Sequence, residues 1–130
     1  MSQVPEPTGA SRPQPPATEG AARGRRHAKV VRLRPEHREE YLRLHAEVWP
    51  EVLATITACH IRNYSIFLHG DLLFSYYEYV GEDHEADMER MAADPATQRW
   101  WKLTDPCQEP VEGTPEGEWW MPVPEVFHHG

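Results

Sequence analysis

Two β-prone runs separated by a glycine and an aspartate constrain the fold of this chain more than any other feature. Residues 61–69 and 72–80 are rich in Ile, Leu, Phe and Tyr, and only Gly70-Asp71 lies between them. A two-residue connection that contains glycine is typical of a β-hairpin. The sequence therefore predicts two antiparallel neighbouring strands, around which the other elements have to pack.

The segment before the hairpin predicts a strand and a long helix. A short β-prone run at 30–33 precedes Pro35, which is a favourable first residue for a helix. Apolar or aromatic residues then recur at the helical period, at positions 41, 44, 48, 49, 52, 53 and 56. Pro50 lies inside this pattern. Because proline lacks an N–H, we expect a kink there, with Pro50 as the first residue of the second segment.

The segments after the hairpin complete an α+β domain. Residues 83–93 predict a short helix, and Asp94-Pro95 marks a break before a further helical turn over 97–103. Residues 105–117 are rich in Pro and Gly and predict a loop, and 119–128 predict a last strand with Pro122 and Pro124 at an edge or bulge. The order β, α, β, β, α, β is the ferredoxin-like, or split βαβ, arrangement, with an antiparallel sheet covered by helices on one face.

The other face of such a sheet is left bare, and a bare apolar face favours a partner. We therefore expect a homodimer that forms through this face or along a strand edge, as in dimeric α+β barrels.

Charge and composition exclude several functional classes. The formal net charge is −8, with 13 Lys and Arg against 21 Asp and Glu, so nucleic acid and anionic membranes are not expected partners. No run approaches the roughly 18 apolar residues of a membrane span, and the start of the chain lacks the apolar stretch of a secretory signal. We expect a soluble, cytoplasmic protein. Cys59 and Cys107 have no metal-binding or redox spacing, and we expect two buried or idle thiols.

The start of the chain differs in composition from the rest. Residues 1–27 consist mainly of Pro, Gly, Ala, Ser, Thr and Gln and end in a basic cluster, which predicts a disordered N-terminal extension. Residues 28–130 are then expected to form a single domain, since domains commonly run to about 100–150 residues.

A histidine lies inside the apolar stripe of the first predicted helix. Tyr41, His45 and Trp49 are spaced four residues apart, and at about 100° per residue they project from one side of the helix. A lone histidine on an apolar face is more often a core group satisfied by a backbone carbonyl than a catalyst. The helix pattern alone leaves both interpretations of His45 open.

Residue types that suit a sugar are found in three of the predicted elements. A pyranose presents an apolar C–H face and a rim of hydroxyls, which match a flat indole and hydroxyl or imidazole groups. Packing alone is a serious alternative for Tyr64, because strand alternation places it on one face with Arg62, Ile66 and Leu68. The residues concerned are Tyr41, His45, Asn63, Tyr64, Arg99, Trp100, Trp101 and Lys102.

Three further features bear on a possible site. Trp119-Trp120 has no comparable polar neighbours and is interpreted as structural. Glu78 interrupts an apolar strand face, so its carboxylate is either solvent-facing or placed against something polar. The eight histidines are scattered, without the spacing of a metal site, so we expect no metal.

Taken together, these segments closely resemble the L-rhamnose mutarotases. The combination is specific, although each string alone is weak, and the strings occur in the family's order over nearly all of residues 29–128. They are PEHREEYLRLH (35–45), VWPE (48–51), NYSIFL (63–68), LLF followed by Glu78, QRWWK (98–102) and EVF (125–127). The chain departs from the family at 46–48, where it has Ala-Glu-Val and members often carry Asn-Pro-Ile. This difference bears on the shape of the pocket and on which deoxysugar fits best.

The resemblance implies a dimeric ferredoxin-like protein that interconverts the α and β anomers of L-rhamnose without a cofactor. It implies His45 as the proton donor and Tyr41, Tyr64, Trp100 and Trp101 as residues that contact the sugar. Mutarotation needs a proton delivered to the ring oxygen and one removed from the anomeric hydroxyl, and a histidine with a pKa of ~6.5 can carry either. The second proton carrier stays open among a bound water, Tyr64 and Glu78.

Two other functions fit the same fold. A non-catalytic small-molecule-binding or regulatory module would bind a sugar without accelerating anomer exchange. A cofactor-free oxygenase or isomerase on a similar dimeric barrel would prefer an apolar aromatic substrate.

Overall fold

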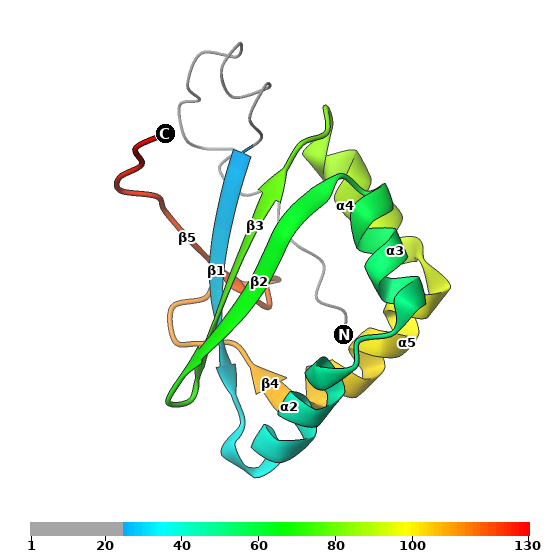
Figure 1. Ribbon diagram of the computed structural model, residues 1–130. Helices are drawn as coiled ribbons and strands as arrows, with labels where there is room; N and C mark the ends of the chain where they lie inside the picture. The colour runs from blue at the N-terminus through cyan, green and yellow to red at the C-terminus, as the bar shows by residue number, and fades with distance from the viewer. Residues whose placement is uncertain (1–24) are drawn as a thin grey trace.

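The computed structural model describes residues 25–130, which fold into one antiparallel sheet and a layer of helices (Figure 1). The strands are β1 (Arg25–Leu33), β2 (Ile61–His69), β3 (Leu72–Tyr79), β4 (Gln108–Glu109) and β5 (Met121–Val123). The α-helices are α2 (Arg38–Ala46), α3 (Pro50–Ala58), α4 (His84–Ala93) and α5 (Pro95–Thr104), with short 3-10 turns at Pro35–His37 and Asp105–Cys107.

The sheet has the predicted ferredoxin-like topology. Its strand order is β2-β3-β1-β4, β5 also pairs with β1, and the ladders are antiparallel. β2 and β3 form the expected hairpin, and Gly70 in its turn has φ +59°, a conformation that glycine adopts without steric cost. The fourth strand of the predicted arrangement is divided between β4 and β5.

The helices cover one face of the sheet, here called the inner face, and leave the outer face bare (Figure 1). Side chains alternate between these faces, so Val31 and Leu33 of β1 and Leu73 of β3 point inward and are at most 1% exposed. Phe67 and Phe74 are register partners on the outer face and are 59% and 40% exposed. The inner face therefore carries the core and the outer face carries an exposed apolar surface.

Pro50 divides the first predicted helix into two rather than kinking it. α2 ends at Ala46, and α3 begins at Pro50, as the sequence predicted for the second segment. Trp49 is extended, with φ −61° and ψ 138°, because a residue that precedes proline is driven out of the helical region. The resulting bend allows α2 and α3 to follow the curved sheet as separate elements.

Two predicted boundaries differ from the structure. β1 begins at Arg25, earlier than the strand predicted at residue 30, and Arg25, Arg26 and His27 pair with β3 as its first residues. Residues 1–24, the rest of the predicted disordered extension, lie outside the described residues. The last strand covers only 121–123 of the expected 119–128, since Pro122 and Pro124 have no N–H to donate to a ladder.

Cys59 and Cys107 are both buried free thiols, as predicted. Within residues 25–130, no helix is long and apolar enough to cross a membrane.

Candidate active site

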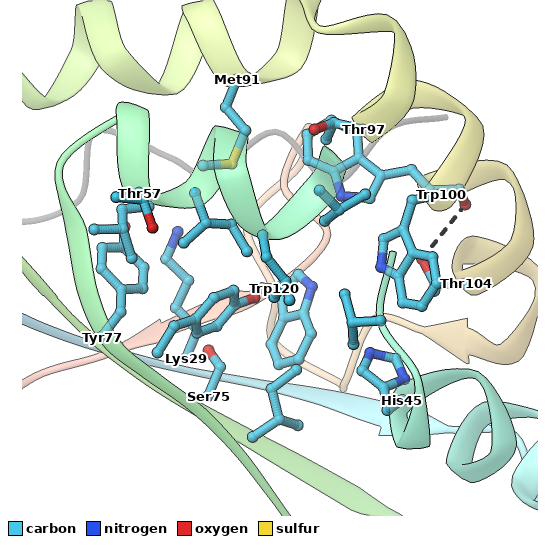
Figure 2. A pocket seen from close by; sticks show the side chains of 18 of the residues that line it. Lys29, His45, Thr57, Ser75, Tyr77, Met91, Thr97, Trp100, Thr104 and Trp120 are labelled. Carbon is cyan, nitrogen blue, oxygen red and sulfur yellow. Dashed lines mark hydrogen bonds between the residues drawn. The ribbon is translucent and has the colours of Figure 1, made fainter. Parts of the chain in front are cut away.

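A cavity of about 520 Å³ lies between the inner face of the sheet and the helices (Figure 2). Its volume is within the range of roughly 300–1,000 Å³ that small-molecule sites occupy. The five site residues predicted from the sequence all line it, although they come from α2, β2 and α5. These residues are Tyr41, His45, Tyr64, Trp100 and Trp101.

His45 is held in a defined orientation by its own helix. Its Nδ1 lies 3.0 Å from the backbone carbonyl oxygen of Tyr41, one turn earlier. A carbonyl only accepts, so Nδ1 carries the hydrogen and Nε2 is the nitrogen that remains for a ligand. Burial lowers the pKa of His45 below its ordinary value of 6.5, and the hydrogen bond to Tyr41 opposes this effect in part. At neutral pH the imidazole is therefore mainly neutral, with a proton-accepting Nε2.

Aromatic rings pack around His45 on two sides. Its ring centroid lies 4.2 Å from that of Tyr41 and 5.3 Å from that of Trp100, the latter in an edge-on arrangement. The ring of Trp49 packs edge-on against that of Trp100, with 5.1 Å between the ring centroids. Trp49 is not among the residues that line the cavity. Tyr41 and His45 therefore both line the cavity, and Trp49 supports Trp100 from outside it.

A chain of hydrogen bonds fixes the hydroxyl of Tyr41. The indole Nε1 of Trp119 donates to Oε1 of Gln108 at 2.9 Å, and Nε2 of Gln108 donates to the Tyr41 oxygen at 3.1 Å. Because an indole N–H only donates, it sets the orientation of the Gln108 amide, and Tyr41 must then accept from it. Burial raises the pKa of Tyr41, so its hydroxyl keeps its hydrogen and has it available for another acceptor.

Tyr64 faces the cavity because β2 contains a bulge. Asn63 has φ +52°, and the register with β3 shifts between Arg62 and Ser65. Asparagine tolerates this left-handed conformation, and bulges commonly redirect a side chain beside a functional site. The bulge breaks the simple alternation, so Arg62, predicted to share a face with Tyr64, pairs instead opposite Glu78. The ring of Tyr64 lies 5.8 Å from that of Tyr77 on β3.

Glu78 is on the opposite side of the sheet from the cavity. The Tyr76 hydroxyl donates to its Oε2 at 2.7 Å, and Nδ2 of Asn63 donates to its Oε1 at 2.9 Å. These two hydrogen bonds lower the pKa of Glu78. The hypothesis that Glu78 transfers a proton in this cavity is therefore wrong, and its carboxylate instead supports the bulge.

Trp120 is a second correction, because it lines the cavity instead of being purely structural. It is 8% exposed and packs with Val31, Leu33 and Tyr41. Its neighbour Trp119 orients the amide of Gln108, which in turn donates a hydrogen bond to Tyr41. In the sequence this pair precedes a stretch that contains Pro122 and Pro124, and nothing local indicates that the chain folds back over the pocket.

Residues of β1 and β3 that the sequence interpretation missed also line the cavity. Lys29, Ser75 and Tyr77 alternate with outward residues, and each points inward. The signal for Lys29 was present in the sequence: it lies two residues before Val31 and four before Leu33, on the same strand face. It was missed because the predicted strand began at residue 30.

One group of possible metal ligands occurs in residues 25–130. Atoms of His37, Glu40 and Cys107 lie within 4.8 Å of one another, and none of the three residues lines the cavity.

Comparisons with known proteins agree with the fold and with the motifs. A family model described as L-rhamnose mutarotase matches residues 26–129. The L-rhamnose mutarotase of Phocaeicola vulgatus is 33% identical over 107 residues, which cover 80% of this chain and 97% of that protein.

Two solved structures share the fold at low sequence identity. The L-rhamnose mutarotase of Formosa agariphila has a TM-score of 0.63 and 21% identity, and the match covers 82% of this chain and 99% of that one. Tetracenomycin F2 cyclase of Streptomyces glaucescens, a type-II polyketide cyclase, has a TM-score of 0.59 and 18% identity over 82% of this chain and 96% of its own. The fold thus serves different chemistries, whereas the family match covers most of the sequence, and this chain belongs to the L-rhamnose mutarotase family.

Proposed function

We propose that this protein is an isomerase that interconverts the α and β anomers of L-rhamnopyranose. The observation that carries the proposal is the gathering of Tyr41, His45, Tyr64, Trp100 and Trp101 around one cavity, in a chain whose family match extends over residues 26–129. These residues supply hydroxyl groups, an acid–base group and flat apolar surfaces, which are what a pyranose requires.

His45 carries the proton transfer in this proposal. In its neutral form, Nε2 accepts the proton of the anomeric hydroxyl while the ring oxygen gains a proton, and the C1–O5 bond opens to the aldehyde. Rotation about the C1–C2 bond presents the other carbonyl face, and ring closure returns both protons. A pKa lowered by burial suits this cycle, because the imidazole that accepts the proton gives it back more readily.

Tyr41 is the group that we propose for the ring oxygen. Its own oxygen accepts from Gln108, which leaves the hydroxyl hydrogen for a substrate oxygen. Because burial raises the pKa of Tyr41, its hydroxyl keeps its proton during the reaction and donates a hydrogen bond to the ring oxygen. A water bound with the sugar gives a proton to the ring oxygen and takes one from the protonated Nε2 of His45, so ring opening moves one proton from the anomeric hydroxyl to the ring oxygen with no net gain or loss. Tyr64 at the edge of the cavity contacts a sugar hydroxyl.

The tryptophans provide the apolar surface in this proposal. Trp100 and Trp101 are 6% and 8% exposed, and α5 is fixed at its start because Oδ2 of Asp94 accepts from the backbone N–H of Thr97. Indoles held in this way can stack on the C–H face of the sugar and keep water from the open-chain aldehyde. Neither the family match nor the relatives described above support a non-catalytic binding module instead.

We also propose that the protein acts as a homodimer. The support is the outer face of the sheet, where Phe67 and Phe74 lie side by side in register and Val123 of β5 is 43% exposed. A second copy placed on this face would bury them. The cytoplasmic location stays a prediction, which fractionation of cells would test.

The direct test of the activity is anomer exchange measured by NMR saturation transfer. The protein, present at far lower concentration than L-rhamnose, should increase transfer between the α and β anomeric resonances above the rate in buffer. Exchange at the buffer rate, with sugar binding still visible in tryptophan fluorescence, would contradict catalysis and support a binding module.

A further inference from the structure

Three possible metal ligands from two distant segments meet outside the cavity. They are His37, Glu40 and Cys107, and we call them the Cys107 cluster. One ligand atom of each residue lies within 4.8 Å of those of the other two. Spacing along the sequence does not indicate this site, because Cys107 follows Glu40 by 67 residues and only folding brings them together. None of the steps proposed above uses these side chains.

Ordered backbone holds all three residues of the Cys107 cluster. His37 ends the 3-10 turn at Pro35–His37, and Glu40 follows three residues later in the first turn of α2. Cys107 ends the second 3-10 turn, and its carbonyl accepts the backbone N–H of Arg34 at 2.8 Å. This hydrogen bond joins the two turns directly, so the ligands are positioned before any ion binds.

The distances within the cluster are close to those around a tetrahedral zinc ion. Zinc binds N and O at about 2.0–2.2 Å and S at about 2.3 Å, which places its ligand atoms about 3.3–3.7 Å apart. Nδ1 of His37 lies 3.3 Å from Oε1 of Glu40, and Sγ of Cys107 lies 4.0 Å from the same oxygen. A small rotation of the Glu40 side chain, which is 42% exposed, brings the sulfur into this range.

One ligand of the cluster is buried and two reach solvent. Cys107 is 0% exposed, whereas the side chain of His37 is 36% exposed and that of Glu40 is similar. An ion can therefore enter from solvent and keep a water molecule on its open side. Burial, with Glu40 as a second cause, raises the pKa of Cys107 to about 11, so a metal that binds has to displace the hydrogen of the thiol.

We propose that the Cys107 cluster binds one Zn²⁺ ion, with a water molecule as the fourth ligand. An imidazole, a carboxylate and a thiolate together suit zinc, whereas Mg²⁺ and Ca²⁺ take oxygen ligands. The site is separate from the cavity, and the proposal does not depend on the mutarotase function.

The bound ion has a structural role, because it joins the start of α2 to the turn before β4 (Figure 1). The ligand Glu40 is followed directly by Tyr41. The ligand Cys107 is followed directly by Gln108, which donates to the Tyr41 oxygen at 3.1 Å. The ion therefore fixes the two segments whose side chains meet in this hydrogen bond.

Co²⁺ is the probe for this site, because it accepts the tetrahedral ligands of Zn²⁺ and absorbs light. Wild-type protein, kept reduced with a phosphine, should bind one Co²⁺ per chain. The spectrum should show the visible bands of tetrahedral cobalt and a near-ultraviolet thiolate-to-cobalt band. ZnCl₂ should remove both features and MgCl₂ should not. Saturating Zn²⁺ should also raise Tm by about 5 °C or more, since an ion that binds the native state stabilises it.

Variants of the three residues identify the ligands. Cys107→Ala should lose the thiolate-to-cobalt band. His37→Gln and Glu40→Gln, both at partly exposed positions, should weaken cobalt binding by about tenfold or more.

Two controls separate this site from other thiols and imidazoles of the chain. Cys59→Ala removes the other buried thiol and is the matched control for sulfur. A double variant, His128→Gln with His129→Gln, removes two exposed imidazoles near the end of the chain. Both controls should keep the cobalt spectrum and the increase in Tm.

Four results would overturn the proposal. They are no cobalt binding by the wild type, cobalt binding without a thiolate band, a thiolate band that persists in Cys107→Ala, and a Tm that saturating Zn²⁺ leaves unchanged. Undiminished affinity in both His37→Gln and Glu40→Gln would overturn it as well. The wild-type spectrum and these two variants decide the question even where Cys107→Ala fails to fold.

Discussion

At the scale of single residues, the site depends on hydrogen bonds that assign a direction to each polar group. The Tyr41 carbonyl places the hydrogen of neutral His45 on Nδ1, and Trp119 sets the amide of Gln108. Neither hydrogen bond is made to the sugar itself. The first decides which nitrogen of His45 is a donor and which is an acceptor, and the second decides that the Gln108 amide donates to the Tyr41 oxygen.

Gln108 is therefore predicted to be a positioning residue. Gln108→Met keeps the volume but removes the N–H that Tyr41 accepts, so the Tyr41 hydroxyl loses its fixed direction. We expect kcat/KM for L-rhamnose to fall about three- to tenfold, mostly in kcat, as for the loss of one hydrogen bond. Trp119→Phe, which frees the amide to flip, should show a smaller decrease. Unchanged kinetics in the Met variant would contradict the role of Gln108.

The candidate site was predictable where one local pattern carries it. The spacing of Tyr41 and His45 along a helix predicts a shared face, and Trp100-Trp101 is visible as a pair. Lys29 was missed only because the strand was predicted to begin one residue after it, although its alternation with Val31 and Leu33 is local. Trp120 was not predicted, because its place in the cavity depends on the path of a long loop, which is set by tertiary packing and leaves only weak traces in the sequence.

At the scale of secondary structure elements, the bulge in β2 and the division at Pro50 shape the cavity. Both depend on a single residue with a backbone preference: Asn63 adopts φ +52°, and Pro50 begins α3. The motif containing Asn63 was recognised, but its bulge was not predicted. Strand alternation assumes a regular ladder, and one extra residue reverses the face of every side chain on one side of it.

The bulge can be tested by changing only the backbone preference of residue 63. Asn63→Val places a β-branched residue in the left-handed region, which should cost roughly 1–2 kcal/mol of stability and turn Tyr64 away from the cavity. We expect KM for L-rhamnose to rise several-fold. Asn63→Gly keeps the left-handed conformation but loses the hydrogen bond to Glu78, and it should keep KM near the wild-type value. Equal KM values for the two variants would contradict the bulge as the cause.

At the scale of the whole molecule, two buried histidines make stability depend on pH. His27 and His84 have native pKa values of about 3 and about 4, against 6.5 for ordinary histidine. Below pH 6.5 the unfolded chain binds more protons than the native state, so the free energy of unfolding falls as pH decreases. Each histidine contributes at most about 1.4 kcal/mol per pH unit.

Chemical denaturation at pH 7.0 and 4.5 measures this effect. The wild type should lose stability over this range, and His84→Gln, whose side-chain oxygen can accept from Tyr77, should lose less. A free energy of unfolding that stays constant between the two pH values would contradict the burial of neutral histidines in the folded state.

The outer face of the sheet leads to a prediction about assembly. Sedimentation velocity should show the wild type as a dimer, and Phe67→Lys should shift it to the monomer, because a charge would be placed in the proposed interface. Leu42→Lys is the matched control, since Leu42 is also exposed, at 46%, but lies on α2. A monomeric wild type, or a dimer that survives Phe67→Lys, would contradict the proposed interface.

The central claim is that Nε2 of His45 transfers the proton in anomer exchange, and one variant tests it most directly. In His45→Asn, the shorter amide side chain can still reach the Tyr41 carbonyl but has no atom at the place of Nε2, and His69→Asn on β2 is a control outside the cavity. NMR saturation transfer with L-rhamnose should show catalysed exchange reduced about 10²- to 10⁴-fold in His45→Asn and unchanged in His69→Asn. Exchange at the wild-type rate in a folded His45→Asn variant would contradict the account.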